Sequence, residues 1–167
     1  VDMWQWFHQL ASPRWFYQAS GKFLPWISVL GLFFISLGLL WGLGFAPQDA
    51  KQGNSFRIIY IHVPSSFLAL AGYYIMAAAG AIAVIWKIKL ADIVMKVAAP
   101  IGAAFTFVAL LTGAIWGKPT WGTYWIWDAR ITSMLILFFL YLGVIILQRS
   151  YEHKGLSSKA AALLALV

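Results

Sequence analysis

The sequence contains no cysteine and only five acidic residues among its 167 positions. Without cysteine it can form neither a disulfide nor a thiolate metal site, so a metal would need histidine, methionine, tyrosine or carboxylate ligands, or would arrive inside a cofactor. Charged residues of both signs amount to 10%, hydrophobic residues reach 62%, and the mean hydropathy is +0.80. This composition excludes an ordinary soluble domain. We therefore interpret the chain as an integral membrane protein in contact with the lipid bilayer.

The shortage of acidic residues gives the chain a formal net charge of +7. A nucleic-acid groove would gather such bases into a stripe or patch. Here the lysines and arginines stand singly between apolar segments, which is typical of the loops of a membrane protein. We expect no nucleic-acid partner.

Four apolar segments are long enough, or nearly so, to cross a membrane. A segment of 23 residues covers about 34 Å as a helix, which suffices for a hydrocarbon core of about 30 Å. Proline is best tolerated in a first helical turn, so we begin the second helix at Pro64; the alternative is one longer helix kinked there. The expected membrane helices are residues 24–46, 64–86, 97–116 and 131–147, with 160–167 as the start of a fifth.

These segments predict an all-α fold, a polytopic membrane helix bundle. Residues 3–23, aromatic and lightly basic, are expected to lie along the membrane surface as an interfacial segment. The run 160–167 is too short to cross a bilayer, so we expect the natural protein to continue beyond it. Small residues in the second and third helices, such as Gly80 and Gly102, suit close helix packing.

The basic residues predict how the bundle is oriented, because cytoplasmic loops carry the excess of lysine and arginine. The N-terminal segment, the 87–96 turn and the 148–159 loop hold eight of them, whereas the 47–57 and 116–130 loops hold four. The first group is therefore expected in the cytoplasm and the second outside, which in a bacterial inner membrane means the periplasm. This multi-pass arrangement places His62 and the 116–130 loop on one outer face.

The 116–130 loop contains four of the ten tryptophans, one tyrosine and three charged residues. An indole has apolar faces and one N–H donor, so it suits the membrane–water boundary or the wall of a pocket for a large flat ligand. A helical loop would align Trp121, Tyr124, Trp125 and Asp128, whereas an extended one would align Trp121, Trp125 and Trp127. Gly117, Pro119 and Gly122 disfavour a regular helix in its first half. In either case at least three rings share a face.

A haem would use what this outer face offers. The macrocycle needs flat apolar contacts, the iron needs a nitrogen ligand such as the His62 imidazole, and the two propionates need cations. Asp128 fits best as a partner of Arg130 or of an indole N–H. The competing interpretations are an interfacial or capping His62, and arginines that only reach from helix ends to the membrane surface. His8 and His153 are expected at the surface. The candidate haem-binding residues are Arg57, His62, Trp116, Lys118, Trp121, Tyr124, Trp125, Trp127, Asp128 and Arg130, with His62 as axial ligand.

Residues 121–133, Trp-Gly-Thr-Tyr-Trp-Ile-Trp-Asp-Ala-Arg-Ile-Thr-Ser, closely resemble the tryptophan-rich "WWD" signature of membrane haem-handling proteins. Within that group the chain resembles the haem exporter protein C family of the bacterial cytochrome c maturation system. Tyr124 stands where the family commonly has tryptophan, which preserves the ring. The likeness extends through residues 44–47, 53–64, 99–103 and 116–119.

The resemblance implies a six-helix, periplasm-facing protein that binds haem b and is a transport subunit, not an enzyme. Its implied partners are the membrane and ATPase subunits of an ABC transporter, a small single-helix membrane subunit, and a periplasmic haem chaperone that receives the haem. His62 matches the first of two periplasmic histidines in the family, and the second belongs to a loop outside this chain. Two alternatives stay open: a cytochrome c synthase of the same superfamily, which joins haem directly to apocytochrome, and a purely structural membrane anchor.

Overall fold

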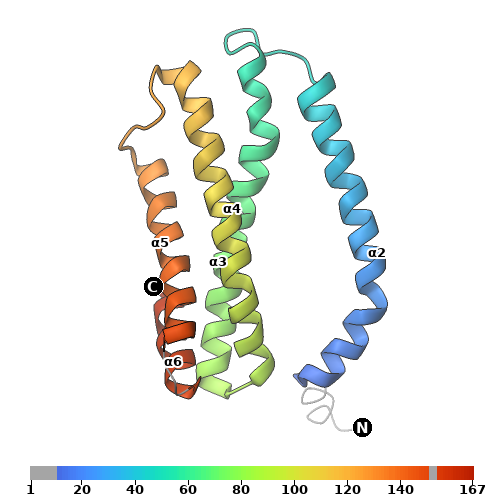
Figure 1. The fold of residues 1–167 in the computed structure, drawn as a ribbon, viewed down its shortest axis with the longest axis vertical. Coiled ribbons are helices and arrows are strands. Elements are labelled where there is room, and N and C mark those ends of the chain that lie inside the picture. The colour runs from blue at the N-terminus through green and yellow to red at the C-terminus, as the bar shows by residue number, and fades with distance from the viewer. Residues whose placement is uncertain (1–10, 151–153) are drawn as a thin grey trace.

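The computed structural model describes residues 11–150 and 154–167, which form an all-α membrane helix bundle without strands (Figure 1). His8 and His153 lie outside the described residues. The elements are α2 (Pro13–Leu39), the π-helical η1 (Leu40–Phe45), the 3₁₀-helical η2 (Asn54–Ile58), α3 (Ile59–Trp86), α4 (Lys89–Trp121), α5 (Ala129–Ser150) and α6 (Lys154–Ala165).

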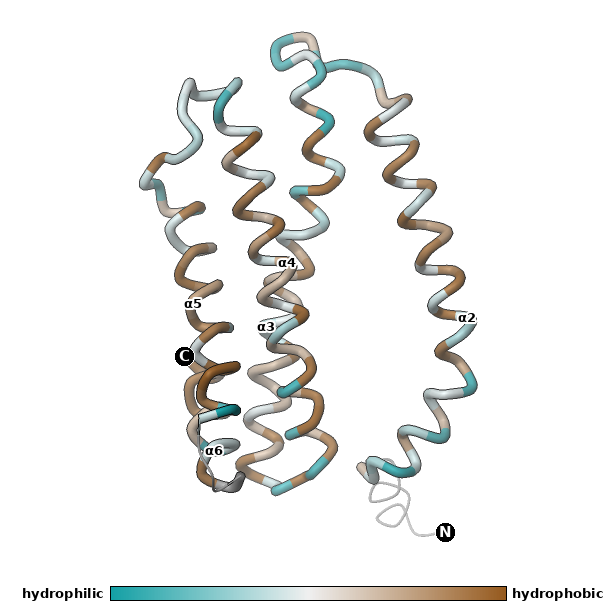
Figure 2. Tube along the Cα trace, viewed as in Figure 1, coloured by the Kyte–Doolittle hydropathy of each residue, from teal (hydrophilic) through white to brown (hydrophobic). Residues whose placement is uncertain are grey.

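Four of these helical stretches are long and apolar enough to span a membrane, namely Pro13–Phe45, Asn54–Trp86, Lys89–Trp121 and Ala129–Ser150. The protein is therefore a multi-pass membrane protein. Its middle is mostly apolar, and polar residues are commonest toward the two ends (Figure 2). The end that carries the 46–53 and 122–128 connections is called the loop end below.

The first helix is longer than the predicted 24–46. It begins at Pro13, so residues 13–23 are its first turns and not a separate interfacial segment. Pro13 stands at the start of the helix, where its missing N–H costs nothing. Residues 14–23 contain no proline and no two adjacent glycines that would interrupt the helix before Leu24. Pro25 lies inside the helix, and Figure 1 shows α2 bending toward the bundle in its first turns, as expected where a proline interrupts the hydrogen-bond ladder.

The predicted start of the second helix at Pro64 was wrong, because α3 begins at Ile59 and includes Pro64. The helix continues directly from η2, so Asn54–Trp86 forms one continuous stretch. This is the alternative of a longer helix containing the proline. His62 consequently lies within the first turn of α3 instead of in a loop before it.

The third and fourth helices also extend beyond their predicted bounds of 97–116 and 131–147. α4 starts at Lys89 because the charged residues of its first turns form an i,i+4 pair, with Lys96 Nζ 2.6 Å from Asp92 Oδ2. At the loop end α4 includes Gly117 and Pro119 and stops only at Gly122, which has a φ of 80°. Only glycine adopts such a left-handed conformation at little cost, so it ends the helix there. The fifth helical run starts at Lys154, not at residue 160.

The core lies at the end opposite the loop end, where α3, α4, α5 and α6 meet. Small residues let the helices approach closely, including Ala69 and Ala79 of α3 and Ala99 and Ala103 of α4, all buried. Tyr141 of α5 is fully buried among them, and its hydroxyl donates a 2.7 Å hydrogen bond to the Ala69 carbonyl.

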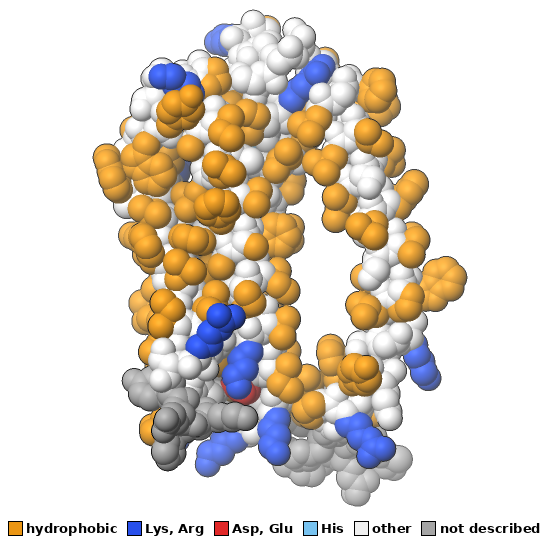
Figure 3. All heavy atoms as spheres, in the orientation of Figure 1, with side chains coloured by type: hydrophobic (Ala, Val, Ile, Leu, Met, Phe, Trp, Pro, Cys, Tyr) orange, Lys and Arg blue, Asp and Glu red, His pale blue; other side chains and the backbone are white. Residues whose placement is uncertain are grey.

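Helix α2 stands apart from this bundle. None of its residues is buried, and Figure 3 shows an open gap between its middle and the other helices. Its continuation η1 approaches the bundle closely at the loop end, where the buried Gly42 packs against the ring of Tyr60.

Candidate functional site

His62 lies at the loop end of α3 and faces α4. Its Nδ1 atom is 3.0 Å from the carbonyl oxygen of Ala109 and 3.1 Å from the Thr112 hydroxyl. Its main-chain carbonyl accepts a 2.9 Å hydrogen bond from Ser66 one turn further along α3. Both its backbone and its ring are therefore held within the outer part of the bundle.

The Ala109 contact determines which ring nitrogen of His62 carries the proton. A carbonyl oxygen can only accept, so an Nδ1 atom at 3.0 Å must donate to it. In a neutral imidazole the other nitrogen, Nε2, then keeps a free lone pair. A ring whose Nδ1–H donates to a backbone carbonyl is the usual arrangement of a metal-binding histidine.

Trp116 packs edge-on against the His62 ring, with 5.8 Å between the ring centroids. The indole is fixed from behind by Gln52, whose side-chain oxygen accepts a 2.8 Å hydrogen bond from Nε1. Phe56 also makes an edge contact with Trp116, at 6.4 Å between centroids. The 46–53 connection and η2 thus hold the tryptophan that forms one wall beside His62.

Gly113 leaves room for the imidazole. A Cβ atom at this position would lie 3.0 Å from Cε1 and 3.4 Å from Nδ1 of His62, closer than side chains normally approach. Gly113 and Gln52 were not among the residues predicted from the sequence. Neither has a sequence signal of its own, because each acts through a partner that only the fold brings close.

The connection after α4 is not helical, since residues 122–124 form bends and 125–128 have no regular structure. Charged groups hold its two ends. Lys118 Nζ donates a 3.0 Å hydrogen bond to the Gly122 carbonyl and lies 5.2 Å from the centre of the Tyr124 ring. Trp125 and Trp127 contact each other at 5.4 Å between centroids. Trp125 turns its Nε1 inward, where it finds no acceptor among the described residues.

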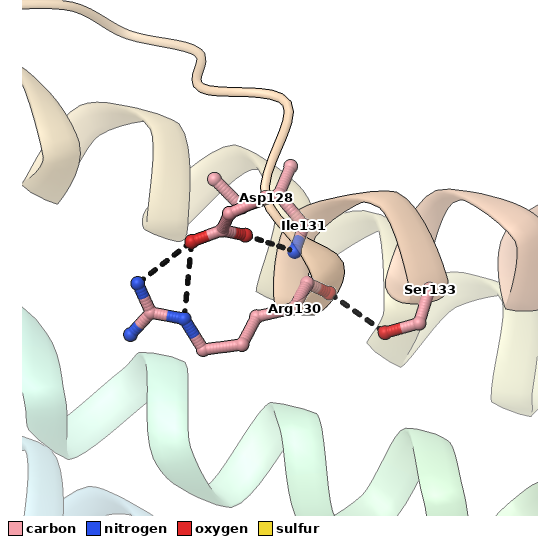
Figure 4. Close-up of polar contacts among 4 residues, drawn as sticks. All are labelled: Asp128, Arg130, Ile131 and Ser133. Carbon is pink, nitrogen blue, oxygen red and sulfur yellow. Dashed lines mark hydrogen bonds and ion pairs between the residues drawn. The ribbon is translucent and has the colours of Figure 1, made fainter.

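Asp128 ends the connection and begins α5 (Figure 4). Its Oδ1 accepts a 2.9 Å hydrogen bond from the Ile131 amide, as a helix N-cap does, and its Oδ2 accepts bonds of 3.1 and 2.7 Å from Nε and Nη2 of Arg130. The Ile131 amide and the Arg130 guanidinium together lower the pKa of Asp128, so it is a carboxylate at neutral pH. The pairing with Arg130 is one of the two that the sequence suggested.

Arg130 connects this cap to the aromatic loop. Its guanidinium carbon lies 5.4 Å from the Trp121 ring centre, a cation–π distance. Its side chain is 76% exposed, so the group is presented outward while Asp128 restricts its direction.

Two cavities flank His62 and share its ring, Gly113, Arg130 and Ile131 as walls. The first, of about 320 Å³, extends between α3 and α5 toward Leu70 and is bounded by Tyr124 and Trp125. The second, of about 260 Å³, is bounded by Gln52, Trp116 and Trp121. His62 and the tryptophan loop therefore lie at the same end of the bundle and border common space.

Four of the candidate residues, Arg57, Lys118, Trp127 and Asp128, do not line either cavity. Arg57 is directed away, and its guanidinium donates to the carbonyls of Leu43 and Ala46 at the end of η1. Trp127 is 75% exposed and touches Trp125 from outside. Lys118 is exposed beside Tyr124. The structure thus brings together His62, Trp116, Trp121, Tyr124, Trp125 and Arg130, with Asp128 acting through Arg130.

The sequence also matches known proteins. The family model described as CcmC, heme exporter protein C, matches residues 6–167. The chain is 48% identical to heme exporter protein C of Escherichia coli (strain K12) over 165 residues, which cover 99% of this chain and 67% of that protein. It is 49% identical to the protein of that name from Haemophilus influenzae over 164 residues, covering 98% and 67%. For Bradyrhizobium diazoefficiens the identity is 45% over 158 residues, covering 95% and 60%. The chain spans about two thirds of the length of the first two.

Proposed function

Since this chain belongs to the haem exporter protein C family, we propose that it holds haem at the loop end of the bundle, with His62 Nε2 as an axial ligand of the iron. The observation that carries this assignment is the 3.0 Å contact between His62 Nδ1 and the Ala109 carbonyl, which leaves Nε2 as the free nitrogen. Haem handling for cytochrome c maturation is the role that the family supports.

The chemical types of the residues around His62 suit a porphyrin ligand. The two cavities that His62 lines offer space beside the imidazole, and the rings of Trp116, Trp121, Tyr124 and Trp125 supply flat apolar contacts. The inward Nε1 of Trp125 has no acceptor among the described residues, so a ligand or a water would satisfy it. We take the group to be haem b, whose vinyl groups supply the chemistry of later covalent attachment.

Arg130 is the best partner for a propionate. Asp128 engages its Nε and Nη2 atoms, and Nη1 has no acceptor in the described part of the chain. Lys118 stands nearby as a second cation beside Tyr124. Arg57 is left out of the proposed site because all of its guanidinium nitrogens donate to helix-end carbonyls.

We place the loop end in the periplasm, across a bacterial inner membrane. The basic residues Arg14, Lys22, Lys87, Lys89, Lys96 and Arg149 stand toward the opposite end of the spans, against Lys51, Arg57, Lys118 and Arg130 at the loop end, and this excess agrees with the positive-inside rule. In this position the site would pass haem to a periplasmic haem chaperone, within a complex that includes ABC transporter subunits and a small single-helix subunit. The chain itself would position the haem and perform no covalent step.

The test is haem binding by the full-length protein, purified in lipid nanodiscs and followed by its Soret absorption. We expect His62→Ala to lose or shift the band, and added imidazole to restore it by entering the vacated space. Tyr74→Ala is the matched control, because Tyr74 is an exposed residue of the same helix that lines neither cavity. A His62→Ala protein with an unchanged band would remove His62 from the iron.

Whether the protein needs a chaperone is tested separately. Co-expression with an apocytochrome c in cells that lack the periplasmic haem chaperone should yield no holocytochrome if the chain only presents haem. Product formation under those conditions would favour a cytochrome c synthase instead.

A further inference from the structure

One turn of α4 surrounds the Nδ1 edge of His62. Ala109 offers its carbonyl at 3.0 Å, Thr112 offers its hydroxyl at 3.1 Å, and Gly113 offers the space of an absent side chain. The two polar contacts are made to Nδ1, and the space at Gly113 lies beside Cε1, the atom between the two ring nitrogens. Helix α4 therefore supplies both hydrogen-bond acceptors for the protonated Nδ1 atom.

The Thr112 hydroxyl can only accept from His62 in this arrangement. The shorter of its two donor contacts is to the Val108 carbonyl at 2.7 Å, one helical turn earlier, and the other is to the Ala109 carbonyl at 3.3 Å. The oxygen lone pairs that remain face Nδ1. One N–H of His62 is thus shared between a main-chain carbonyl and a side-chain hydroxyl whose direction is itself fixed by the helix.

We propose that Thr112 is a positioning residue, which together with the Ala109 carbonyl fixes the plane and the tautomer of His62 so that its Nε2 lone pair faces the two cavities. A single acceptor would hold one atom and leave the ring free to swing about it. Two acceptors on either side of the N–H define its direction and therefore the direction of Nε2.

This inference depends on the proposed haem function only where it predicts an effect on haem affinity. The ring orientation is a property of the protein without haem. If Nε2 binds iron, hydrogen bonds accepted from Nδ1–H raise the basicity of the ligand nitrogen, and the loss of such a partner typically weakens metal binding by 10- to 100-fold, here taken as about tenfold.

The first experiment needs no haem. The full-length protein is labelled with ¹⁵N-histidine in nanodiscs, and the ring signals of His62 are assigned by their disappearance in His62→Gln. We expect wild type to show a protonated, slowly exchanging Nδ1 and an unprotonated Nε2. Thr112→Val keeps the branched shape but removes the acceptor, so Nδ1–H should exchange faster and a second tautomer should appear, whereas Thr112→Ser should restore the wild-type signals.

Thr106→Val is the matched control. Thr106 is a buried residue of the same helix whose hydroxyl makes the same kind of bond, 2.7 Å to the Gly102 carbonyl, yet it lines neither cavity. Its substitution should leave the His62 signals unchanged. If Thr112→Val also leaves them unchanged, the positioning role is refuted. If both threonine variants disturb them equally, the effect belongs to helix packing and the proposal fails as well.

The second experiment uses haem titration of the same variants. We expect Thr112→Val to bind haem about tenfold more weakly and Thr112→Ser to bind it as wild type does. A protein in which His62→Ala binds haem normally would refute the axial role but not the ring orientation seen by NMR. Normal haem binding by Thr112→Val alone would refute the effect of positioning on the ligand.

Discussion

Arg57 and Ala46 are joined by two hydrogen bonds, with Nε at 3.1 Å and Nη2 at 2.7 Å from the same carbonyl oxygen. A third bond, from Nη1 to the Leu43 carbonyl at 3.0 Å, completes the set. These carbonyls belong to the last turn of the first membrane helix, where the helix itself offers no partner. Arg57 therefore fastens that helix to the start of the next.

We predict that Arg57→Lys loosens this helix end without weakening haem binding. A lysine keeps the charge but lacks the planar fork by which three guanidinium nitrogens reach two carbonyls, so amide exchange in residues 43–46 should accelerate. Loss of hydrogen bonds to a charged donor would cost about 1–3 kcal/mol. Hydrogen-exchange mass spectrometry and haem titration measure the two quantities. Weaker haem binding with unchanged exchange would show that Arg57 contacts the ligand after all.

Lys51→Ala is the control for that experiment. Lys51 lies in the same connection, is exposed, and its only hydrogen bond to a side chain in the described residues is made by its backbone amide. Its removal should leave amide exchange in residues 43–46 at the wild-type rate.

For Gly113→Ala we predict opposite effects on stability and on binding. Alanine is favoured over glycine in a helix by roughly 0.8–1 kcal/mol, which should stabilise or leave unchanged the bundle. The added Cβ would meet His62 Cε1 at 3.0 Å and push the ring out of place, so haem affinity should fall at least severalfold. Gly31→Ala, which adds its Cβ to open space on α2, should change neither affinity nor spectrum. Equal affinity of both variants would contradict the close fit.

The lowered pKa of Asp128 predicts a pH dependence. Because the folded state favours the carboxylate, the stability that Asp128 contributes is fully present above its unfolded pKa, near 3.8. It is lost only as the pH falls through the still lower folded value. The melting temperatures of wild type and Asp128→Asn should therefore differ by a constant amount from pH 7 to about pH 5 and converge only in stronger acid.

Asp128→Asn and Asp128→Ala separate the two roles of this residue. Asparagine is a good helix cap but has no charge for the ion pair with Arg130, whereas alanine provides neither the cap nor the charge. We expect alanine to destabilise the start of α5 more than asparagine does, and both to abolish the ion pair. Identical melting curves for the two variants would mean that the cap contributes nothing.

Tyr141→Phe tests the core independently of the site. It removes the 2.7 Å hydrogen bond to Ala69 and should lower the free energy of unfolding by about 1 kcal/mol, with haem binding unchanged. Tyr74→Phe, at an exposed position, should have no effect on stability. Unfolding in mixed detergent, followed by circular dichroism, would compare them.

The sequence predicted the class of fold and the meeting of His62 with the tryptophan loop at one end of the bundle. Both follow from the lengths and hydropathy of the apolar segments, which can be read from neighbouring residues in the sequence. The helix bounds were less accurate because hydropathy marks the hydrocarbon region, whereas helices continue into the interface where their caps lie. Pro64 illustrates this, since the helix passes through it and starts one turn earlier.

The contacts around the candidate site could not be read from the sequence. Arg57 looked available for an anion because nothing local reveals that the preceding helix ends within its reach. Thr112, Gly113 and Gln52 touch His62 or Trp116 across 50, 51 and 64 positions of chain. Only the packing of α4 against α3 and against the 46–53 connection reveals them. Asp128 is the exception, because an aspartate just before an apolar helix is a recognisable cap.

One of the two acceptors that hold His62 is a peptide oxygen, at Ala109. No ordinary amino-acid replacement deletes that atom, so sequence drift at position 109 can alter bulk but leaves the acceptor in place. The hydroxyl at position 112 has no such protection. The hydrogen bond from His62 to the backbone carbonyl therefore persists whatever side chain stands at position 109. Only the hydrogen bond to the hydroxyl can be lost by a single substitution.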